Sequence, residues 1–183
     1  EILQLKNLQF PIVSGNSLTS VPAYIASLSE LKVLDLGNNK ISALPPVISN
    51  LLKLEELSIE NNRFQKMPAE ICKITPLKIL KIWDNPFSEI PNSICKIEKL
   101  EELFINSDQL VGVIISESSG SDLKTNAKQC IIEEEGDDNQ NEGVAVKSSI
   151  AGLKKLHIRK KGLTVDQQKT IEKVFKATKI IYY

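Results

Sequence analysis

The sequence repeats itself at a fixed interval of 23 residues. The first half of each unit carries three apolar residues followed by an asparagine, as in Leu31, Leu34, Leu36 and Asn39. The same positions hold Leu54, Leu57, Ile59 and Asn62 in the next unit, and Leu77, Leu80, Ile82 and Asn85 in the one after it. A strict interval of this length is typical of solenoids, in which a unit is too short to bury its apolar side chains alone.

The second half of each unit repeats as well. An apolar residue stands before a proline in three successive units, namely Leu44-Pro45, Met67-Pro68 and Ile90-Pro91. A fourth unit opens at Leu100, Leu103 and Ile105, with Asp108 where asparagine is expected. An earlier unit begins at Leu8, and its Pro11 occupies the first strand position. Because proline lacks an N–H group, we expect it to weaken that strand.

Over residues 8–110 this pattern resembles the leucine-rich repeat family. It is most similar to the short 23-residue class with a Leu-Pro step, found in plant intracellular Ras-group proteins and many bacterial proteins. The resemblance implies an α/β solenoid, a horseshoe arc with a parallel sheet on the concave side and short helical turns on the convex side. It also implies binding of a protein partner, with no cofactor.

Elementary chemistry predicts the same shape. In Leu34-x-Leu36 the alternation directs both side chains to one face of a short strand, so stacked copies would form a sheet buried on its inner side. An asparagine amide both donates and accepts hydrogen bonds. Stacked at the turn after each strand, Asn39 and its equivalents could therefore satisfy the backbone groups that the bend leaves unpaired.

We interpret the chain as one domain, 1–183, in three parts: regular repeats over 1–110, an irregular part over 111–152, and the last repeat with a cap over 153–183. Two interpretations of 111–147 remain open at this point. One is an acidic insertion, with an inserted hairpin from Leu110–Ile115 and Gln129–Glu133. The other, which we favour, is longer eroded repeats. Strands beginning at Ala127, Leu153 and Ala177 would then complete a sheet of eight strands.

The C-terminal part contains a helix signal. Thr164 and Gln167 have the spacing of a capping box, and they precede an apolar stripe at helical spacing. The members of the stripe are Ile171, Val174 and Phe175. We therefore predict a capping helix over 165–176, since the last turn of a solenoid would otherwise expose its core.

Composition argues against several other classes of protein. The formal net charge is zero, with an acidic stretch over 116–143 and a basic one over 147–183. The C-terminal lysines are scattered and few aromatic residues lie between them, so we expect a solvated face and no nucleic acid partner. No apolar run reaches the length of about 18 residues that a membrane span needs. The cellular location is left open.

The three cysteines lack the spacing of a metal site or of a disulfide framework. We expect Cys72, Cys95 and Cys130 to be free thiols and predict no metal ion. Phosphate-binding glycine loops, zinc-helix signatures and nucleophile elbows are also missing from the sequence.

The register predicts which side chains line the concave face. Trp83 and Phe104 should be exposed there on adjacent strands, and aromatic residues are common anchors of binding surfaces. The full set of predicted partner-binding residues is Trp83, Phe104, Lys81, Ile79, Glu60, Ile131, His157 and Arg159. An acidic rim of Glu60, Glu102 and Glu133 would favour a partner with a basic ring. A basic end of Lys155, His157 and Arg159 would favour an acidic contact.

His157 is the one histidine of the chain. The predicted register places no cysteine, aspartate or second histidine beside it, so we expect a solvated side chain without a catalytic or metal-binding role. The sequence therefore predicts a non-catalytic module that binds a protein on its concave face.

Two alternatives remain. The chain could be a regulatory or targeting fragment of a larger multidomain enzyme, which the lack of a visible cap before Leu8 favours. It could also self-associate through an exposed last strand at Ile180–Tyr183.

Overall fold

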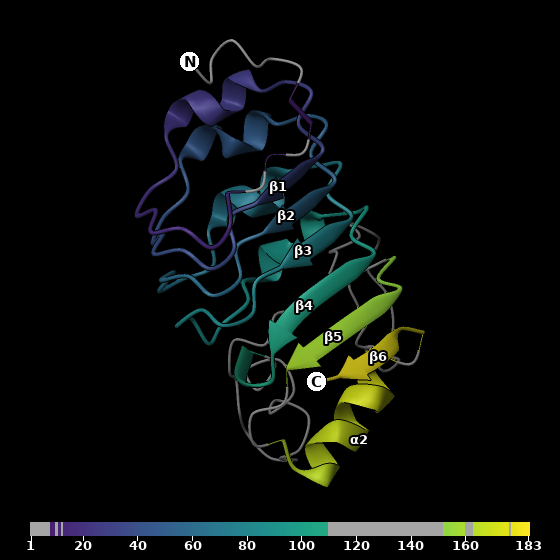
Figure 1. The fold of residues 1–183 in the computed structure, drawn as a ribbon. Coiled ribbons are helices and arrows are strands. Elements are labelled where there is room, and N and C mark those ends of the chain that lie inside the picture. The colour runs from purple at the N-terminus through teal and green to yellow at the C-terminus, as the bar shows by residue number, and fades with distance from the viewer. Residues whose placement is uncertain (1–7, 10, 12, 110–151, 160–162, 176) are drawn as a thin grey trace, which may run out of the picture.

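The computed structural model describes residues 8, 9, 11, 13–109, 152–159, 163–175 and 177–183. They form one solenoid, with parallel strands stacked along one side and short helices along the other (Figure 1). The strands are β1 (Val33–Asp35), β2 (Glu56–Ser58), β3 (Ile79–Lys81), β4 (Glu102–Asn106), β5 (Lys155–Arg159) and β6 (Lys179–Tyr182). The 3-10 helices opposite the sheet are η2 (Ala23–Ser27), η3 (Pro46–Asn50), η4 (Ala69–Lys73) and η5 (Asn92–Lys96).

The register of the sheet follows the sequence repeat. Leu34 pairs with Leu57, Leu57 with Leu80, and Leu80 with Leu103, so equivalent residues of successive units lie side by side. All four leucines are buried. They belong to one continuous core that also contains the apolar residues of the 3-10 helices, such as Ile48. The predicted parallel solenoid is confirmed.

The sheet passes directly from β4 to β5. Phe104 pairs with His157, within a register that runs from Glu102–Lys155 to Asn106–Arg159. The expectation that a strand beginning at Ala127 lies between them is therefore wrong. Residues 110–151, including Ile131 and the alternative hairpin, lie outside the described residues. The physical reason is core volume: Leu156 and Ile158 are fully buried beside β4, whereas the predicted strand would supply only alanine and cysteine at two core positions.

The first turn stacks on β1 through backbone hydrogen bonds. The amides of Lys32 and Val33 donate to the Gln9 carbonyl at 3.0 and 3.1 Å, and the Val13 amide donates to the Asp35 carbonyl at 3.1 Å. Pro11 stands 23 positions before Leu34 and has no N–H to add to this ladder. The described residues of this turn are accordingly not assigned to a strand.

Helix α2 (Val165–Val174) precedes the last strand. The predicted capping box is present: Thr164 Oγ1 accepts from the Gln167 amide at 3.2 Å, and the Thr164 amide donates to Gln167 Oε1 at 2.8 Å. The helix ends two residues before the predicted position. Ile171 and Phe175 are buried in the common core, so α2 closes the C-terminal turns of the solenoid.

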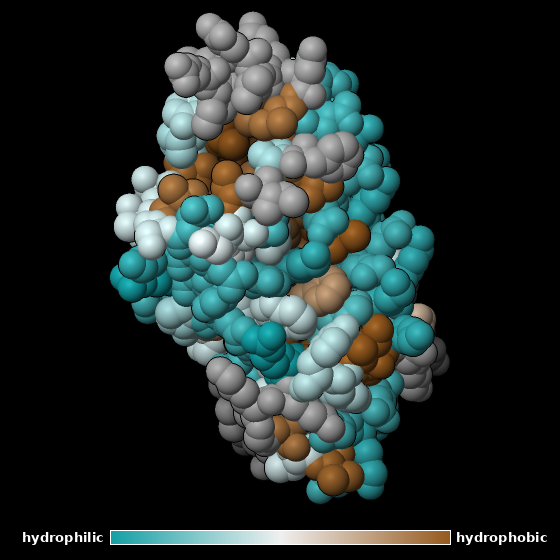
Figure 2. Space-filling model, viewed as in Figure 1, coloured by the Kyte–Doolittle hydropathy of each residue, from teal (hydrophilic) through white to brown (hydrophobic). Residues whose placement is uncertain are grey.

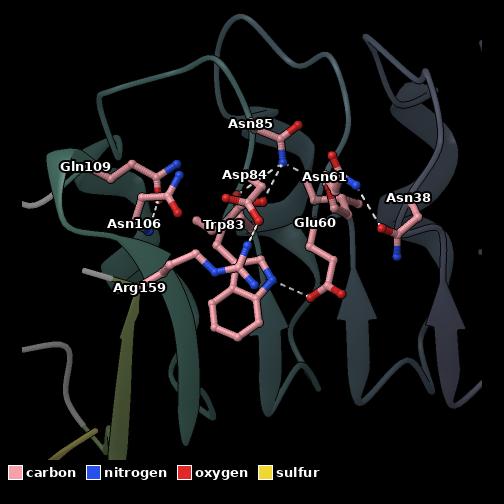
Figure 3. A network of polar contacts seen from close by, with 11 residues as sticks. Asn38, Glu60, Asn61, Trp83, Asp84, Asn85, Asn106, Gln109 and Arg159 are labelled. Atoms are coloured by element: carbon pink, nitrogen blue, oxygen red, sulfur yellow. Dashed lines mark hydrogen bonds and ion pairs between the residues drawn. The ribbon is translucent and has the colours of Figure 1, made fainter. Parts of the chain in front are cut away.

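A ladder of buried asparagines holds the turns after β1, β2 and β3. Asn62 Nδ2 donates to the carbonyls of Leu36, Ile59 and Glu60 at 2.9, 3.2 and 3.0 Å, and its Oδ1 accepts from the Ile41 amide at 2.9 Å. Asn39 makes the equivalent bonds one unit earlier. Asn85 makes them one unit later (Figure 3). The amide thus joins two successive turns and satisfies their backbone groups, as the sequence predicted.

The fourth unit departs from the ladder. Asp108, predicted to replace the asparagine, is exposed. The buried residue is Gln109, whose Nε2 donates to the Phe87 carbonyl at 3.2 Å and whose Oε1 accepts from the Asn106 amide at 2.9 Å. The reason is that an ionised carboxylate has no donor to offer a carbonyl. The longer amide side chain of Gln109, the next residue, makes some of the corresponding hydrogen bonds instead.

This difference predicts the outcome of two matched substitutions. Asn62→Asp should lower the free energy of unfolding by at least about 2 kcal/mol, because the buried carbonyls lose their donor and face a carboxylate. Asn61→Asp should cost less than about 1 kcal/mol, because Asn61 is exposed and the equivalent position in the next unit is already Asp84. Urea-induced unfolding of the wild type and both variants measures the difference. Equal destabilisation by the two substitutions would contradict the ladder.

Candidate protein-binding face

The outward-facing side chains line up across neighbouring strands in columns, as the repeat predicts. The strand expected from residues 127–133 does not lie between β4 and β5. The central column consists of Asp35, Ser58, Lys81, Phe104, His157 and Ile181. As a consequence, Phe104 has His157 as its neighbour on β5, a place that the sequence analysis assigned to Ile131. The predicted neighbours Ile79 and Lys81 lie on β3 as expected.

Four ring-bearing residues from β3 to the end of β6 come together here, and we call them the aromatic cluster: Trp83, Phe104, His157 and Tyr183. The Phe104 and His157 rings are stacked, with centroids 3.8 Å apart and planes 9° apart. Trp83 meets Phe104 edge to face at 5.3 Å and Tyr183 edge to face at 5.7 Å. The edge-to-face geometry is favourable for aromatic pairs. Residues 100 positions apart in the sequence thus build one continuous surface.

The rings differ in exposure from what the sequence predicted. Trp83 and Phe104 are partly buried rather than exposed, because each packs against other members of the cluster. The exposed member is Tyr183, with 57% of its surface accessible. The sequence analysis named Tyr183 only as the end of an exposed last strand and left it out of the candidate site.

His157 is buried, with 6% of its surface exposed, so the prediction of a solvated imidazole is wrong. Its Nδ1 lies 2.9 Å from the Tyr183 hydroxyl. Its Nε2 lies 3.3 Å from Glu102 Oε2, near enough for an ion pair but without hydrogen-bond geometry. Burial lowers the pKa of His157, and the neighbouring Glu102 carboxylate opposes this only in part. The neutral imidazole is therefore the form that this packing favours.

Polar contacts hold the indole of Trp83 from both sides (Figure 3). Its Nε1 donates to Glu60 Oε2 at 2.6 Å, and the guanidinium carbon of Arg159 lies 4.6 Å from the ring centroid. Arg159 also pairs with the carboxylate of Asp84. Asp84, which sequence reasoning missed, has a left-handed backbone with φ of 53°. Asp84 occupies the position of Asn38 and Asn61, the first residue of the Asn-Asn turn in the two earlier units.

Charges on this face are paired across neighbouring strands. Lys81 Nζ lies 2.6 Å from Glu56 Oε1, and Lys155 pairs with Glu102. The hydrogen bond from Lys155 holds the pKa of Glu102 below its usual range. Glu102 of the predicted acidic rim thus pairs with Lys155 of the predicted basic end, because β5 lies next to β4. Glu60 of that rim forms no ion pair among the described residues, and Glu133 lies outside them. Figure 2 accordingly shows a largely hydrophilic surface in this view, with apolar residues in separate groups.

Other chemistry is less prominent in the described part of the chain. No group of three or more histidine, cysteine or acidic residues is placed to hold a metal ion there. Cys72 is a buried free thiol whose Sγ lies 3.3 Å from Ser93 Oγ, and burial raises its pKa. Cys95 and Cys130 stay untested as predictions. No described helix is long and apolar enough to cross a membrane.

Comparisons with known proteins agree with the fold. A family model described as leucine rich repeat matches residues 4–64. No curated protein matches the sequence. A leucine-rich repeat protein of Leptospira interrogans is 22% identical over 99% of this chain, with a TM-score of 0.62. An internalin from Listeria monocytogenes is 18% identical over 98% of this chain, also with a TM-score of 0.62.

A plant structure shares more sequence over a shorter part. It is the leucine-rich repeat ectodomain of a membrane receptor kinase from Arabidopsis thaliana, in complex with Casparian strip integrity factor 2. It is 32% identical over 57% of this chain, with a TM-score of 0.50. This chain spans 38%, 42% and 14% of the three solved chains, respectively.

In the register of its sheet and in these comparisons, the chain is similar to leucine-rich repeat proteins, and it shares their fold. Domains of this class generally mediate protein–protein interactions.

The buried imidazole predicts a pH dependence. A histidine whose pKa is lowered on folding contributes stability that is present above its ordinary value of about 6.5 and is lost as the pH falls through the folded pKa. The wild type should therefore become easier to unfold with urea between about pH 7.5 and pH 5.5. The charged groups that face the ring are Glu102, Lys155 and Lys81, with the Tyr183 hydroxyl at Nδ1.

A His157→Phe variant is the matched control, since it keeps a ring beside Phe104 and leaves no other histidine in the chain. Its unfolding midpoint should vary less with pH over this interval. An NMR titration that places the pKa of His157 above about 6.5 would contradict the burial argument.

Proposed function

We propose that this protein is a non-catalytic module that binds a protein partner on its concave face, with the aromatic cluster as the main contact. The observation that supports this most directly is the convergence of four rings, from β4, β5 and the residues that follow β3 and β6, on one face of the sheet. Trp83 and Phe104 are held in fixed positions by their neighbours, so a partner would meet an ordered surface and would lose little entropy in ordering it.

The electrostatics support an apolar central contact. The ion pairs Lys81–Glu56, Lys155–Glu102 and Arg159–Asp84 surround the rings and largely neutralise one another. A partner need not separate these pairs in order to reach the rings. The plant receptor ectodomain was solved with a bound factor, and this provides a precedent for ligand binding by such a fold.

A catalytic role has less support. The Nδ1 of His157 contacts a tyrosine hydroxyl, one face of its ring is covered by Phe104, and 6% of its surface is exposed. Such an imidazole is poorly placed to reach a substrate. Turnover by the folded chain that disappears on substitution of His157 would contradict this part of the proposal.

A second candidate function is a regulatory or targeting part of a larger multidomain protein. It is favoured by the small share of each solved structure that this chain spans, one of which comes from a receptor kinase. Sequencing of the complete reading frame tests it: an adjoining kinase or other catalytic domain supports this candidate, and a reading frame limited to repeats contradicts it.

The concave-face proposal predicts a graded response to substitution. Proteins captured by the wild type are identified, and their affinities for the wild type and for each variant are then measured with purified components. Trp83→Ala and Phe104→Ala should each weaken binding by more than about 1–2 kcal/mol, while neutralising a paired rim charge such as Lys81 should change mainly the association rate.

Lys73→Glu is the control, because Lys73 is exposed on η4, on the opposite side of the solenoid. Circular dichroism confirms that each variant is folded. If Lys73→Glu reduces affinity while both aromatic variants bind as the wild type does, the concave face is not the binding site.

A further inference from the structure

Near the N-terminal end of the concave face, three side chains converge where Gly37 has none. A Cβ atom added to Gly37 would lie 3.0 Å from Glu60 Cγ, 3.1 Å from Asp35 Oδ1 and 3.3 Å from Ser58 Oγ. These three atoms come from the ends of β1 and β2 and from the turn that follows β2. A residue with a side chain at position 37 would push them apart, so the glycine permits the cluster.

Among the described residues, the two carboxylates in this cluster are hydrogen-bonded but have no basic side chain as a partner. Asp35 Oδ1 accepts from the Gly37 amide at 2.9 Å, and Glu60 Oε2 accepts from the Trp83 indole at 2.6 Å. Both donors are uncharged, and within the described residues no lysine, arginine or histidine forms an ion pair with either acid. The contrast with Glu56 and Glu102 on the same face is clear, since each of those pairs with a lysine.

The third member of the cluster is an unsatisfied hydroxyl. Ser58 is 4% exposed, and its Oγ has no hydrogen-bond partner among the described residues. A buried polar group without a partner is unfavourable, and groups of this kind call for a specific explanation. Because Ser58 Oγ points to the same place as the Asp35 carboxylate, a donor placed there could serve both.

We propose that Asp35, Ser58 and Glu60 form a subsite for the ammonium group of a lysine side chain on the protein partner. A lysine ammonium has three N–H donors and one positive charge, and the subsite offers two carboxylates and one hydroxyl as acceptors. The inference rests on the proposed function, because the lysine belongs to the partner. Glu60 also contacts Trp83, so the subsite adjoins the aromatic cluster. The recognised sequence therefore contains a lysine close to an apolar residue.

A metal ion fits this cluster less well. Calcium takes about six to eight oxygen ligands, and two carboxylates with one hydroxyl fall short of that number. The described residues likewise contain no group of three or more potential metal ligands of the histidine, cysteine or acidic type. A calcium titration nevertheless forms one arm of the test.

The single tryptophan of the chain gives the test a direct signal. N-acetyl-lysine methylamide is titrated into the protein while the Trp83 indole N–H resonance and the Trp83 fluorescence are followed. N-acetyl-norleucine methylamide, which lacks only the amine, is the matched ligand control. The lysine compound should shift the indole resonance in a saturable way, and the norleucine compound should not.

Substitutions locate the binding. Asp35→Asn and Glu60→Gln should each weaken the lysine compound by about threefold or more, because each removes one negative charge and keeps an acceptor oxygen. Gly37→Ala should do the same by displacing Glu60. Glu89→Gln is the matched control, since Glu89 is exposed and lies outside the sheet, and it should leave binding unchanged.

Three results would overturn the subsite: equal effects of the two ligands, an unchanged affinity in Asp35→Asn, or calcium chloride saturating the same signal at lower concentration than the lysine compound. Failure of the proposed function looks different. A protein partner that is lost with Phe104→Ala but retained with Asp35→Asn overturns the subsite and supports the binding face. Saturable lysine binding combined with a partner that attaches to the convex side overturns the proposed function and the assignment of the lysine to that partner, while the affinity of the cluster for an ammonium group stands.

Discussion

A buried asparagine closes each of the turns after β1, β2 and β3 and joins it to the turn before it. A turn of 23 residues cannot bury its own apolar side chains, so its core is completed by its neighbours. The bend after each strand leaves backbone carbonyls without a backbone donor. Asn39, Asn62 and Asn85 donate hydrogen bonds to such carbonyls. Because every amide bonds to two successive turns, it fixes the register as well as the bend. The concave columns, and with them the candidate site, follow from that register.

The aromatic cluster exists because β5 lies next to β4. That pairing places His157 against Phe104 and brings Tyr183 within contact of Trp83. It also pairs Lys155 of the predicted basic end with Glu102 of the predicted acidic rim. The face that results is apolar at its centre and nearly neutral at its rim. The uncompensated acids are at the other end, where Asp35 and Glu60 approach one another above Gly37.

Much of this arrangement could be predicted from the sequence, since a fixed interval determines both the register and the outward column. Trp83 and Phe104 were placed on adjacent strands for that reason. The strand predicted over 127–133 was placed wrongly between β4 and β5. Ala127 and Cys130 match the spacing of the repeat, but their side chains are too small to fill the core as leucine does. The burial of His157 and its contact with Glu102 could not be predicted either, because they depend on which strand is adjacent. The prediction that Asp108 replaces the asparagine was wrong, because the repeat pattern shows only that this position is polar. The turn needs a side chain that donates hydrogen bonds to carbonyl groups.

The central claim is that partners bind at the aromatic cluster, and two tyrosines allow a direct measurement. Tyr183 is 57% exposed beside Trp83, and Tyr24 is 43% exposed on η2, on the opposite side of the solenoid. Hydroxyl-radical footprinting of the protein with and without a bound partner compares their oxidation in one sample. Binding should protect Tyr183, together with Trp83 and Phe104, and leave the oxidation of Tyr24 unchanged. Protection of Tyr24 with undiminished oxidation of Tyr183 would contradict the account.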